Sequence, residues 1–366
     1  MARLSGNEVL KADFLNTRAL VRTEDGQLDG AAADYTTALA IYERALGAEH
    51  LKVAMLLSNM AQVAYLRGRH DESAAQLGRA HAIREAALGR DHPDAASTLI
   101  NLSLVRLGQG KTAEAIEILE RALVSQERTF GKDHPKSTFI LNNLGDALVA
   151  AGRPGEALDR YRRALAILEA DKGSSRRRIA MTRSKMGQAL VKLGRPDEAA
   201  PVLADALAAR RELFPGDHSD KAASLVGLGL ARLGQGKRDE TLSLLREGLA
   251  MLERTEGKDH PDVADALTAL GRALYAGRDF EGAKGELSRA AAIRAAREGP
   301  AADRAETRFW LAKALVGAGR REDRERAAEL MAQARADYRA AGEGVRAAEA
   351  EVEAWAGSAG LSPTGR

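Results

Sequence analysis

The sequence predicts an all-α protein in which about eight helical hairpins stack into a solenoid. The 366 residues are rich in the helix formers Ala, Leu, Arg and Glu, and they include only nine prolines. The segment GKDHP stands at 131–135 and again at 257–261, and the two copies begin 126 residues apart, which is three steps of 42. A fixed period of this length is typical of stacked units that bury their apolar faces against one another.

The GKDHP segment has looser copies at most steps of the repeat, and each copy marks the boundary between two units. Its Asp or His is placed to cap the next helix, and its proline suits a first helical turn, where no N–H is needed. At 172–177 and at 298–303 only the glycine remains. The recognisable copies are LGAEH at 46–50, LGRDHP at 88–93, FGKDHP at 130–135, FPGDHS at 214–219 and EGKDHP at 256–261.

Small residues recur in phase with this signature and predict the interior of each unit. A turn glycine follows seven residues after the small residue of the first helix, except in the seventh unit, which has Arg278. Small side chains let two helix backbones approach closely, so each unit is predicted to hold a first helix, a tight turn and a second helix. The small residues of the first helices are Ala19, Ala61, Ser103, Gly145, Gly187, Gly229 and Gly271.

Eight hairpins account for residues 1–340, and the eighth is irregular because its turn is longer. Val345, Ala348, Val352 and Trp355 fall on one face of a short final helix, which we expect at 341–356 as a cap on the open end. Residues 357–366 are expected to form a disordered tail. The units lie near 8–46, 50–88, 92–130, 134–172, 176–214, 218–256, 260–298 and 302–340.

Charge and composition exclude several classes of function. The net charge is +3, from 55 basic and 52 acidic residues that alternate along the chain. The basic residues form no clustered stripe, so we expect no nucleic-acid partner. The lack of cysteine excludes disulfides, thiolate catalysis and Cys-ligated zinc. Residues 1–20 lack the apolar core of a signal peptide, and no apolar run approaches the roughly 18 residues of a membrane helix. We therefore expect a soluble cytoplasmic protein with no membrane partner.

The histidines are predicted to be structural. Neighbouring copies lie on different hairpins about 10 Å apart, whereas the ligands of a metal must lie about 2 Å from one ion. The HExxH, GxSxG and P-loop patterns are also missing. The sequence therefore predicts no catalytic, metal or cofactor site, and no enzyme. Five of the seven histidines hold the repeat position, namely His50, His92, His134, His218 and His260.

The repeat resembles the tetratricopeptide repeat, and its 42-residue unit with LGxDHP at the boundary is similar to the kinesin light chain type. The segment AEAIEILERALVSQERTFGKDHP at 113–135 carries the match. This resemblance implies a protein-binding scaffold. Residues 310–355 also resemble the end of the repeat arrays found downstream of bacterial Ser/Thr protein kinases, notably in myxobacteria, although the chain contains none of the kinase motifs.

The resemblance further implies that first helices line a concave groove. Groove positions then lie three and two residues before the small first-helix residue and one residue after it. Asn59, Asn101 and Asn143 share one phase in three consecutive units, and their amides either clamp the backbone of an extended peptide or fix the stack by bonding to neighbouring helices. The candidates are Asn16, Ser58, Asn59, Gln62, Asn101, Asn142, Asn143, Asp146, Ser184, Lys185, Gln188, Thr268 and Arg272.

Together these observations predict a right-handed α-solenoid that binds a peptide segment or a protein surface in its groove without a cofactor. Trp310 either anchors that ligand or packs at the closed end near Trp355. One alternative function is a regulatory or partner-docking module of a bacterial Ser/Thr kinase signalling system, detached from its kinase domain and with a kinase as its partner. An enzyme would need converging titratable groups, and an RNA-reading repeat would need base-reading side chains on a basic face.

Overall fold

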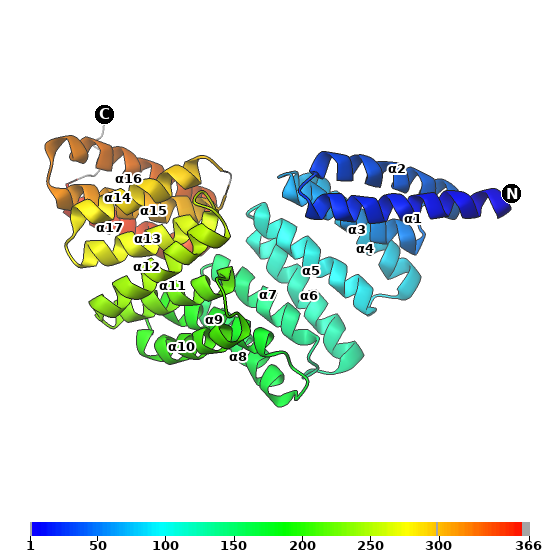
Figure 1. Ribbon diagram of the computed structural model, residues 1–366, viewed down its shortest axis with the longest axis horizontal. Helices are drawn as coiled ribbons and strands as arrows, with labels where there is room; N and C mark the ends of the chain where they lie inside the picture. The colour runs from blue at the N-terminus through cyan, green and yellow to red at the C-terminus, as the bar shows by residue number, and fades with distance from the viewer. Residues whose placement is uncertain (1, 298, 361–366) are drawn as a thin grey trace. The chain divides into compact units, whose positions relative to one another are not determined.

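The computed structural model describes residues 2–297 and 299–360, and within these ranges the chain is helical and contains no strand (Figure 1). Eight helix–turn–helix pairs follow one another, which confirms the predicted all-α repeat. The first helices are α1 (Ala2–Glu24), α3 (Leu51–Leu66), α5 (Pro93–Gly108), α7 (Ser137–Ala150), α9 (Arg176–Lys192), α11 (Ser219–Gly234), α13 (Pro261–Ala276) and α15 (Ala301–Ala318). The second helices are α2 (Leu28–Leu46), α4 (His70–Leu88), α6 (Thr112–Phe130), α8 (Pro154–Ala170), α10 (Pro196–Leu213), α12 (Arg238–Thr255), α14 (Phe280–Ala295) and α16 (Arg321–Ala341).

The helices form two compact units, which divide inside α7 between Ala147 and Leu148. In the first unit α1 packs on α2, α3 on α4 and α5 on α6, while α2 and α4 also contact the first helix that follows them. The same alternation continues from α8 to α16 in the second unit. One apolar core joins α1 to α4, and another runs from α8 to the C-terminal helix, so each hairpin buries its apolar face against its neighbours.

Four of the repeated histidines cap first helices, as predicted, and His134 makes the same bond just ahead of α7. In every case the imidazole Nδ1 accepts a hydrogen bond from the backbone N–H two residues further on, which satisfies one of the N–H groups that a helix start leaves open. The glycines that open the same segments, such as Gly89 and Gly131, have φ near +90° and end the preceding second helix. The five bonds run from Lys52 to His50 (3.1 Å), Asp94 to His92 (3.1 Å), Lys136 to His134 (3.2 Å), Asp220 to His218 (3.1 Å) and Asp262 to His260 (3.3 Å).

The turns inside the hairpins need a left-handed backbone. The predicted turn glycines all have positive φ, for example +74° at Gly110 and +73° at Gly236. In the seventh hairpin the same place holds Arg278, and its φ of 63° is the one positive value at a non-glycine among the described residues. A side chain in this region brings its Cβ close to the following carbonyl, which costs about 1–2 kcal/mol.

We expect Arg278→Gly to raise the free energy of unfolding of the second unit by about 1 kcal/mol, because glycine removes this backbone strain. Chemical denaturation followed by circular dichroism measures the change. Gly236→Arg, which places the same side chain in the equivalent turn one hairpin earlier, should lower the free energy by a similar amount. Equal stabilities for Arg278→Gly and the unchanged chain would show that this turn is not strained.

The periodic small residues of the first helices give room to leucines of the second helices. A Cβ added to Gly187 or Gly271 would overlap the side chain of Leu203 or Leu287, respectively. Both leucines are fully buried. In these hairpins one leucine thus fills the space between the two backbones, and this explains why the sequence has a small residue there.

The last described segments are η1 (Glu343–Val345) and α17 (Arg346–Ser358), which follow α16. In α17, Val352 is fully buried, and Trp355 packs edge-on against Phe309 of α15 with ring centres 5.8 Å apart. A helix thus closes this end of the second unit, and it continues through Ser358, into the expected tail. The rest of that expected tail, 361–366, lies outside the described residues.

The segment η1 also contacts the turn that joins α7 to α8, at the start of the second unit. A Cβ on Gly344 would lie 2.5 Å from the carbonyl carbon of Ala151 and 2.6 Å from its oxygen. A Cβ on Gly152 would overlap the Gly344 carbonyl. Two glycines therefore allow backbone from residues 151–152 and 344 to meet.

Candidate binding groove

In both units, first helices of neighbouring hairpins lie against one another. First helices of neighbouring hairpins contact each other directly, α1 with α3 in the first unit and α9 with α11, α11 with α13 and α13 with α15 in the second. Among the helices described, second helices of neighbouring hairpins make no comparable contacts. These first helices therefore share one side of their unit.

One row of predicted groove residues is buried between these first helices. It lies three residues before the small residue and includes Asn16, Asn142, Ser184 and Thr268, all of which are buried. The Ser184 hydroxyl lies 3.3 Å from that of Ser224 on α11. The Thr268 hydroxyl lies 3.1 Å from that of Thr307 on α15. The seam between first helices thus contains polar contacts that hold the stack together.

The three asparagines of the predicted ladder have different surroundings. The Asn59 Nδ2 donates a hydrogen bond of 3.0 Å to Asn16 Oδ1 on α1, so this amide links two first helices. The Asn143 Nδ2 donates to the Phe139 carbonyl of its own helix at 2.9 Å, and Asn101 is exposed. Asn59 therefore serves the stack, which was one of the two interpretations, while Asn101 is the most accessible amide of the three.

The remaining predicted positions are distributed over both units. Gln62 and Gln188 are exposed, whereas Asp146 and Lys185 are half-buried. Ser58 donates to the Ala54 carbonyl of its own helix at 3.0 Å.

In the second unit, the Arg272 guanidinium donates to Glu306 at 2.8 Å and lies 5.2 Å from the centre of the Trp310 ring. Trp310 packs against Tyr275, with ring centres 5.7 Å apart, and Lys313 lies 4.0 Å from its centre. Trp355 contacts Phe309 instead. Trp310 thus packs among side chains of α13 and α15, and its ring partner is Tyr275, not Trp355 as one of the two interpretations expected.

Each first helix of the first unit presents a row of three side chains at i, i+4 and i+7, which places them on one helix face. We call these four rows the first-unit groove, after the concave surface that the resemblance implies. Asn59, Asn101 and Asn143 are the middle residues of three of these rows. In each row the first residue lies six residues before the small residue of the first helix, and the last lies one residue after it. The rows are Asp13–Thr17–Leu20, Met55–Asn59–Gln62, Ser97–Asn101–Leu104 and Phe139–Asn143–Asp146.

Large apolar side chains in these rows were missed by the sequence analysis, which selected polar residues. Leu20, Met55, Leu104 and Phe139 are exposed by 39%, 37%, 43% and 52%. Their signal was available, because Leu20 and Leu104 share the phase of Gln62. Exposed apolar residues can contact apolar side chains of a ligand, and amides in the same row can hydrogen-bond to a peptide backbone.

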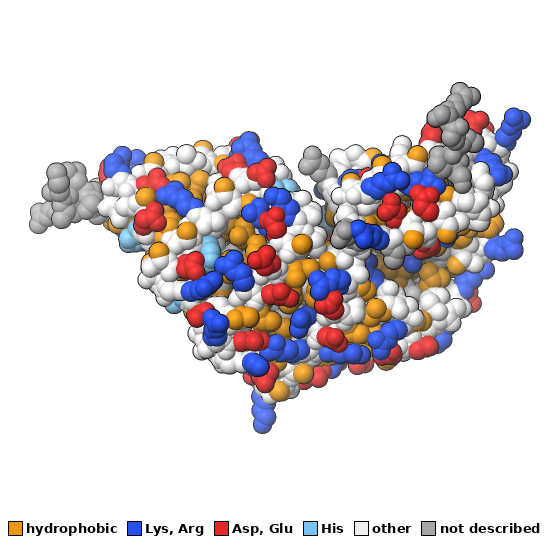
Figure 2. Space-filling view, turned by 180° about the vertical axis from the view of Figure 1, so that it is seen from behind, with side chains coloured by type: hydrophobic (Ala, Val, Ile, Leu, Met, Phe, Trp, Pro, Cys, Tyr) orange, Lys and Arg blue, Asp and Glu red, His pale blue; other side chains and the backbone are white. Residues whose placement is uncertain are grey.

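The first-unit groove carries little charge. Lys52 is the one charged residue of α3 and Asp146 the one of α7. Asp13 is already occupied, since Lys52 donates to it at 2.7 Å and Tyr42 also bonds to it, and both bonds lower the pKa of Asp13. Elsewhere, on the face drawn in Figure 2, basic and acidic side chains alternate. The first-unit groove is therefore less charged than the surface drawn in Figure 2.

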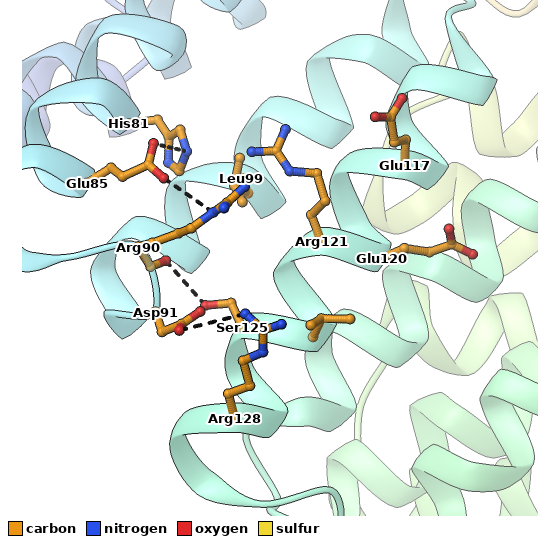
Figure 3. A pocket seen from close by; sticks show the side chains of 11 residues that line it. His81, Glu85, Arg90, Asp91, Leu99, Glu117, Glu120, Arg121, Ser125 and Arg128 are labelled. Carbon is orange, nitrogen blue, oxygen red and sulfur yellow. Dashed lines mark hydrogen bonds and ion pairs between the residues drawn. The ribbon is translucent and has the colours of Figure 1, made fainter.

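A cavity of about 320 Å³ lies between α4, the loop that follows it and α6 (Figure 3). Its charged groups pair with one another. Glu85 lies 3.6 Å from Arg90 and 3.7 Å from His81, and Asp91 lies 4.0 Å from Arg128. Arg121 points toward the cavity, and acidic side chains of the same helix flank it. This mixed lining forms ion pairs and gives no set of catalytic groups.

Among the side chains described, no three His, Asp or Glu residues come together in a way that could hold a metal ion. Within the same ranges, no helix has the length and apolar character needed to span a bilayer.

Comparison with known families and structures identifies the repeat. A family model described as tetratricopeptide repeat matches residues 10–86, 52–124, 94–170, 178–254 and 220–296. Among curated proteins none matches the chain.

Solved structures share the architecture at low sequence identity. Aspartyl phosphate phosphatase F from Bacillus subtilis has a TM-score of 0.65 and 15% identity over 80% of this chain and 72% of its own. The Rap conjugation gene regulator of plasmid pLS20, in complex with the Phr* peptide, has a TM-score of 0.58 and 18% identity over 81% and 77%. A kinesin light chain-type repeat protein of Podosopora anserina has a TM-score of 0.50 and 23% identity over 57% and 98%.

Proposed function

The chain belongs to the tetratricopeptide repeat family, and on this premise we propose that it is a non-enzymatic cytoplasmic scaffold that binds a peptide segment of another protein in the first-unit groove. The carrying observation is the set of i, i+4, i+7 rows, in which asparagines at one phase lie beside the exposed Met55, Leu104 and Phe139, while the α1 row adds the exposed Leu20. Asn101 and Asn143 would bond to the peptide backbone, and the apolar side chains would receive those of the peptide.

The chemistry of the groove indicates the kind of peptide. Because α3 and α7 carry so few charges, recognition of the peptide would depend on apolar contacts and on hydrogen bonds from side-chain amides. Binding should then change little with salt, because screening acts on exposed charges. The likeness to a Rap regulator solved with a peptide supports the capacity of this architecture to hold one.

We expect Asn101→Ala combined with Asn143→Ala to weaken peptide binding about tenfold, since each lost hydrogen bond is worth about 0.5–1.5 kcal/mol. The probe is the tightest peptide selected by the unchanged protein from a random displayed library, and calorimetry measures its Kd. Lys185→Ala with Gln188→Ala, at groove phases of the second unit, is the matched control and should bind normally. Selection of strongly charged peptides, or equal binding by the asparagine variant, would contradict the proposal.

A second candidate function is docking in Ser/Thr kinase signalling, and the resemblance of residues 310–355 to kinase-linked arrays favours it. In the structure this segment comprises half of α15, all of α16 and most of α17. Co-purification from the source cell distinguishes the two candidates. A Ser/Thr kinase retained by the protein, and lost when residues 310–355 are altered, would support docking, whereas retention that depends on Asn101 and Asn143 would support the first-unit groove.

A further inference from the structure

The outer side of α1 carries a stripe of exposed apolar residues that the proposed groove does not use. Leu10, Phe14 and Val21 are exposed by 66%, 62% and 53%. With Thr17 they follow spacings of four, three and four residues, which is the pattern of a helix that packs along another helix. We call Leu10, Phe14 and Val21 the α1 stripe.

The repeat shows what usually covers this stripe. At the phase of Phe14 the next three hairpins hold Leu56, Thr98 and Ile140, and at the phase of Val21 they hold Val63, Val105 and Ala147. All six are at most 3% exposed. In these hairpins the face packs against the hairpin before it, as α2 packs on α3 and α4 on α5. At Phe14 and Val21 the α1 stripe therefore stands where other hairpins have stacking residues, and both side chains are exposed.

We propose that the α1 stripe pairs with the α1 stripe of a second copy of this chain, in an antiparallel arrangement about a twofold axis. Such a pair places Phe14 opposite the partner's Val21. The same register brings Lys11, which is exposed, opposite the partner's Asp25, which is also exposed. The face is thus complementary to itself in both apolar contact and charge, as a closed twofold interface requires.

Two other features favour a closed pair. Arg18 is held against Asp34 by bonds of 2.7 and 2.6 Å, and its guanidinium lies 5.5 Å from the centre of the Phe14 ring, so one side of the ring is supported within the chain. The opposite end of the repeat is covered by α17, whose Val352 and Ala356 are fully buried, so head-to-tail stacking has no matching face there. The stripe is narrow, and we expect a weak dimer with a Kd on the order of 10 μM.

Sedimentation velocity of the full chain over a range of concentrations tests the pairing. The unchanged protein should pass from monomer to dimer. Phe14→Glu should raise the dimer Kd about 100-fold, the scale of a central aromatic anchor, with unchanged circular dichroism. Val124→Glu is the matched control, because Val124 on α6 is exposed by 47% and lies away from the stripe. It should leave the dimer intact.

Charge reversal tests the register independently of the Phe14 variant and of folding. Lys11→Asp should weaken the dimer several-fold, and Asp25→Lys in the same chain should restore it. A protein that stays monomeric at every concentration would overturn the proposal. Equal loss of the dimer in Val124→Glu, or no rescue by the second reversal, would also overturn it. Peptide binding in the first-unit groove is measured separately and does not depend on this result.

Discussion

Gly271→Val should lower the free energy of unfolding of the second unit by about 3 kcal/mol. A Cβ at this position already overlaps Leu287, and both δ carbons of that leucine would lie 2.9 Å from it. Leu287 is fully buried at the contact of α13 with α14 and has no room to move. The added methyl groups must therefore push two helices apart. Both tryptophans of the chain, Trp310 and Trp355, lie in this unit, so tryptophan fluorescence during urea unfolding measures the loss.

A pair of identical changes separates packing from helix propensity. Gly285 stands in α14, where a Cβ would meet no atom within 4 Å. Gly285→Ala should therefore stabilise the unit by about 0.5–1 kcal/mol. Gly271→Ala makes the same chemical change in α13 and should destabilise it. If both variants were stabilised alike, the small residues would reflect sequence history and not a close approach of helices.

Val352→Asp should release α17 from the second unit. Val352 is fully buried, so the carboxylate would be placed in the apolar core without a partner, which costs several kcal/mol. Detachment of a single terminal helix is the cheaper response. We expect amide hydrogen exchange across 346–358 to speed up about 100-fold and Trp355 fluorescence to shift to the red as the ring leaves Phe309. The rest of the unit should stay folded, with a lowered Tm.

Ala354→Asp is the control for this change. It introduces the same charge into α17 two residues further on, at an exposed position. Exchange and fluorescence should stay close to those of the unchanged chain. Fast exchange in both variants would mean that burial of Val352 is not what attaches α17 to the second unit. Slow exchange in both variants would mean that α17 stays attached without Val352.

The sequence was sufficient to predict the hairpins because their signals are local and repeated. The histidine caps depend on backbone N–H groups two residues away, and the turn glycines depend on one φ angle each. Gly271 and its equivalents reflect contact between helices of the same hairpin. Even the exception was visible, since Arg278 breaks the glycine rule, and the structure gives it a positive φ of 63°.

The groove was predictable only in part. Periodicity placed Asn59 and Asn101 on one face, yet Asn59 bonds to Asn16 across 43 residues of chain, and no local pattern reports such a pair. Residues three before the small position have the same composition as groove residues, but they are buried in the seam between first helices. The exposed Leu104 and Phe139 were overlooked, because an apolar residue in a repeat is usually part of the core.

The sequence by itself determined that the chain forms helical hairpins that stack, because caps, turns and small residues act over a few residues and recur every 42. Only the tertiary structure decided which side chains of a first helix face a neighbouring helix and which face water. That choice depends on how neighbouring hairpins curve against one another and on where a stack ends. For the same reason Leu56 is buried while Phe14, at the same phase of the repeat, is exposed.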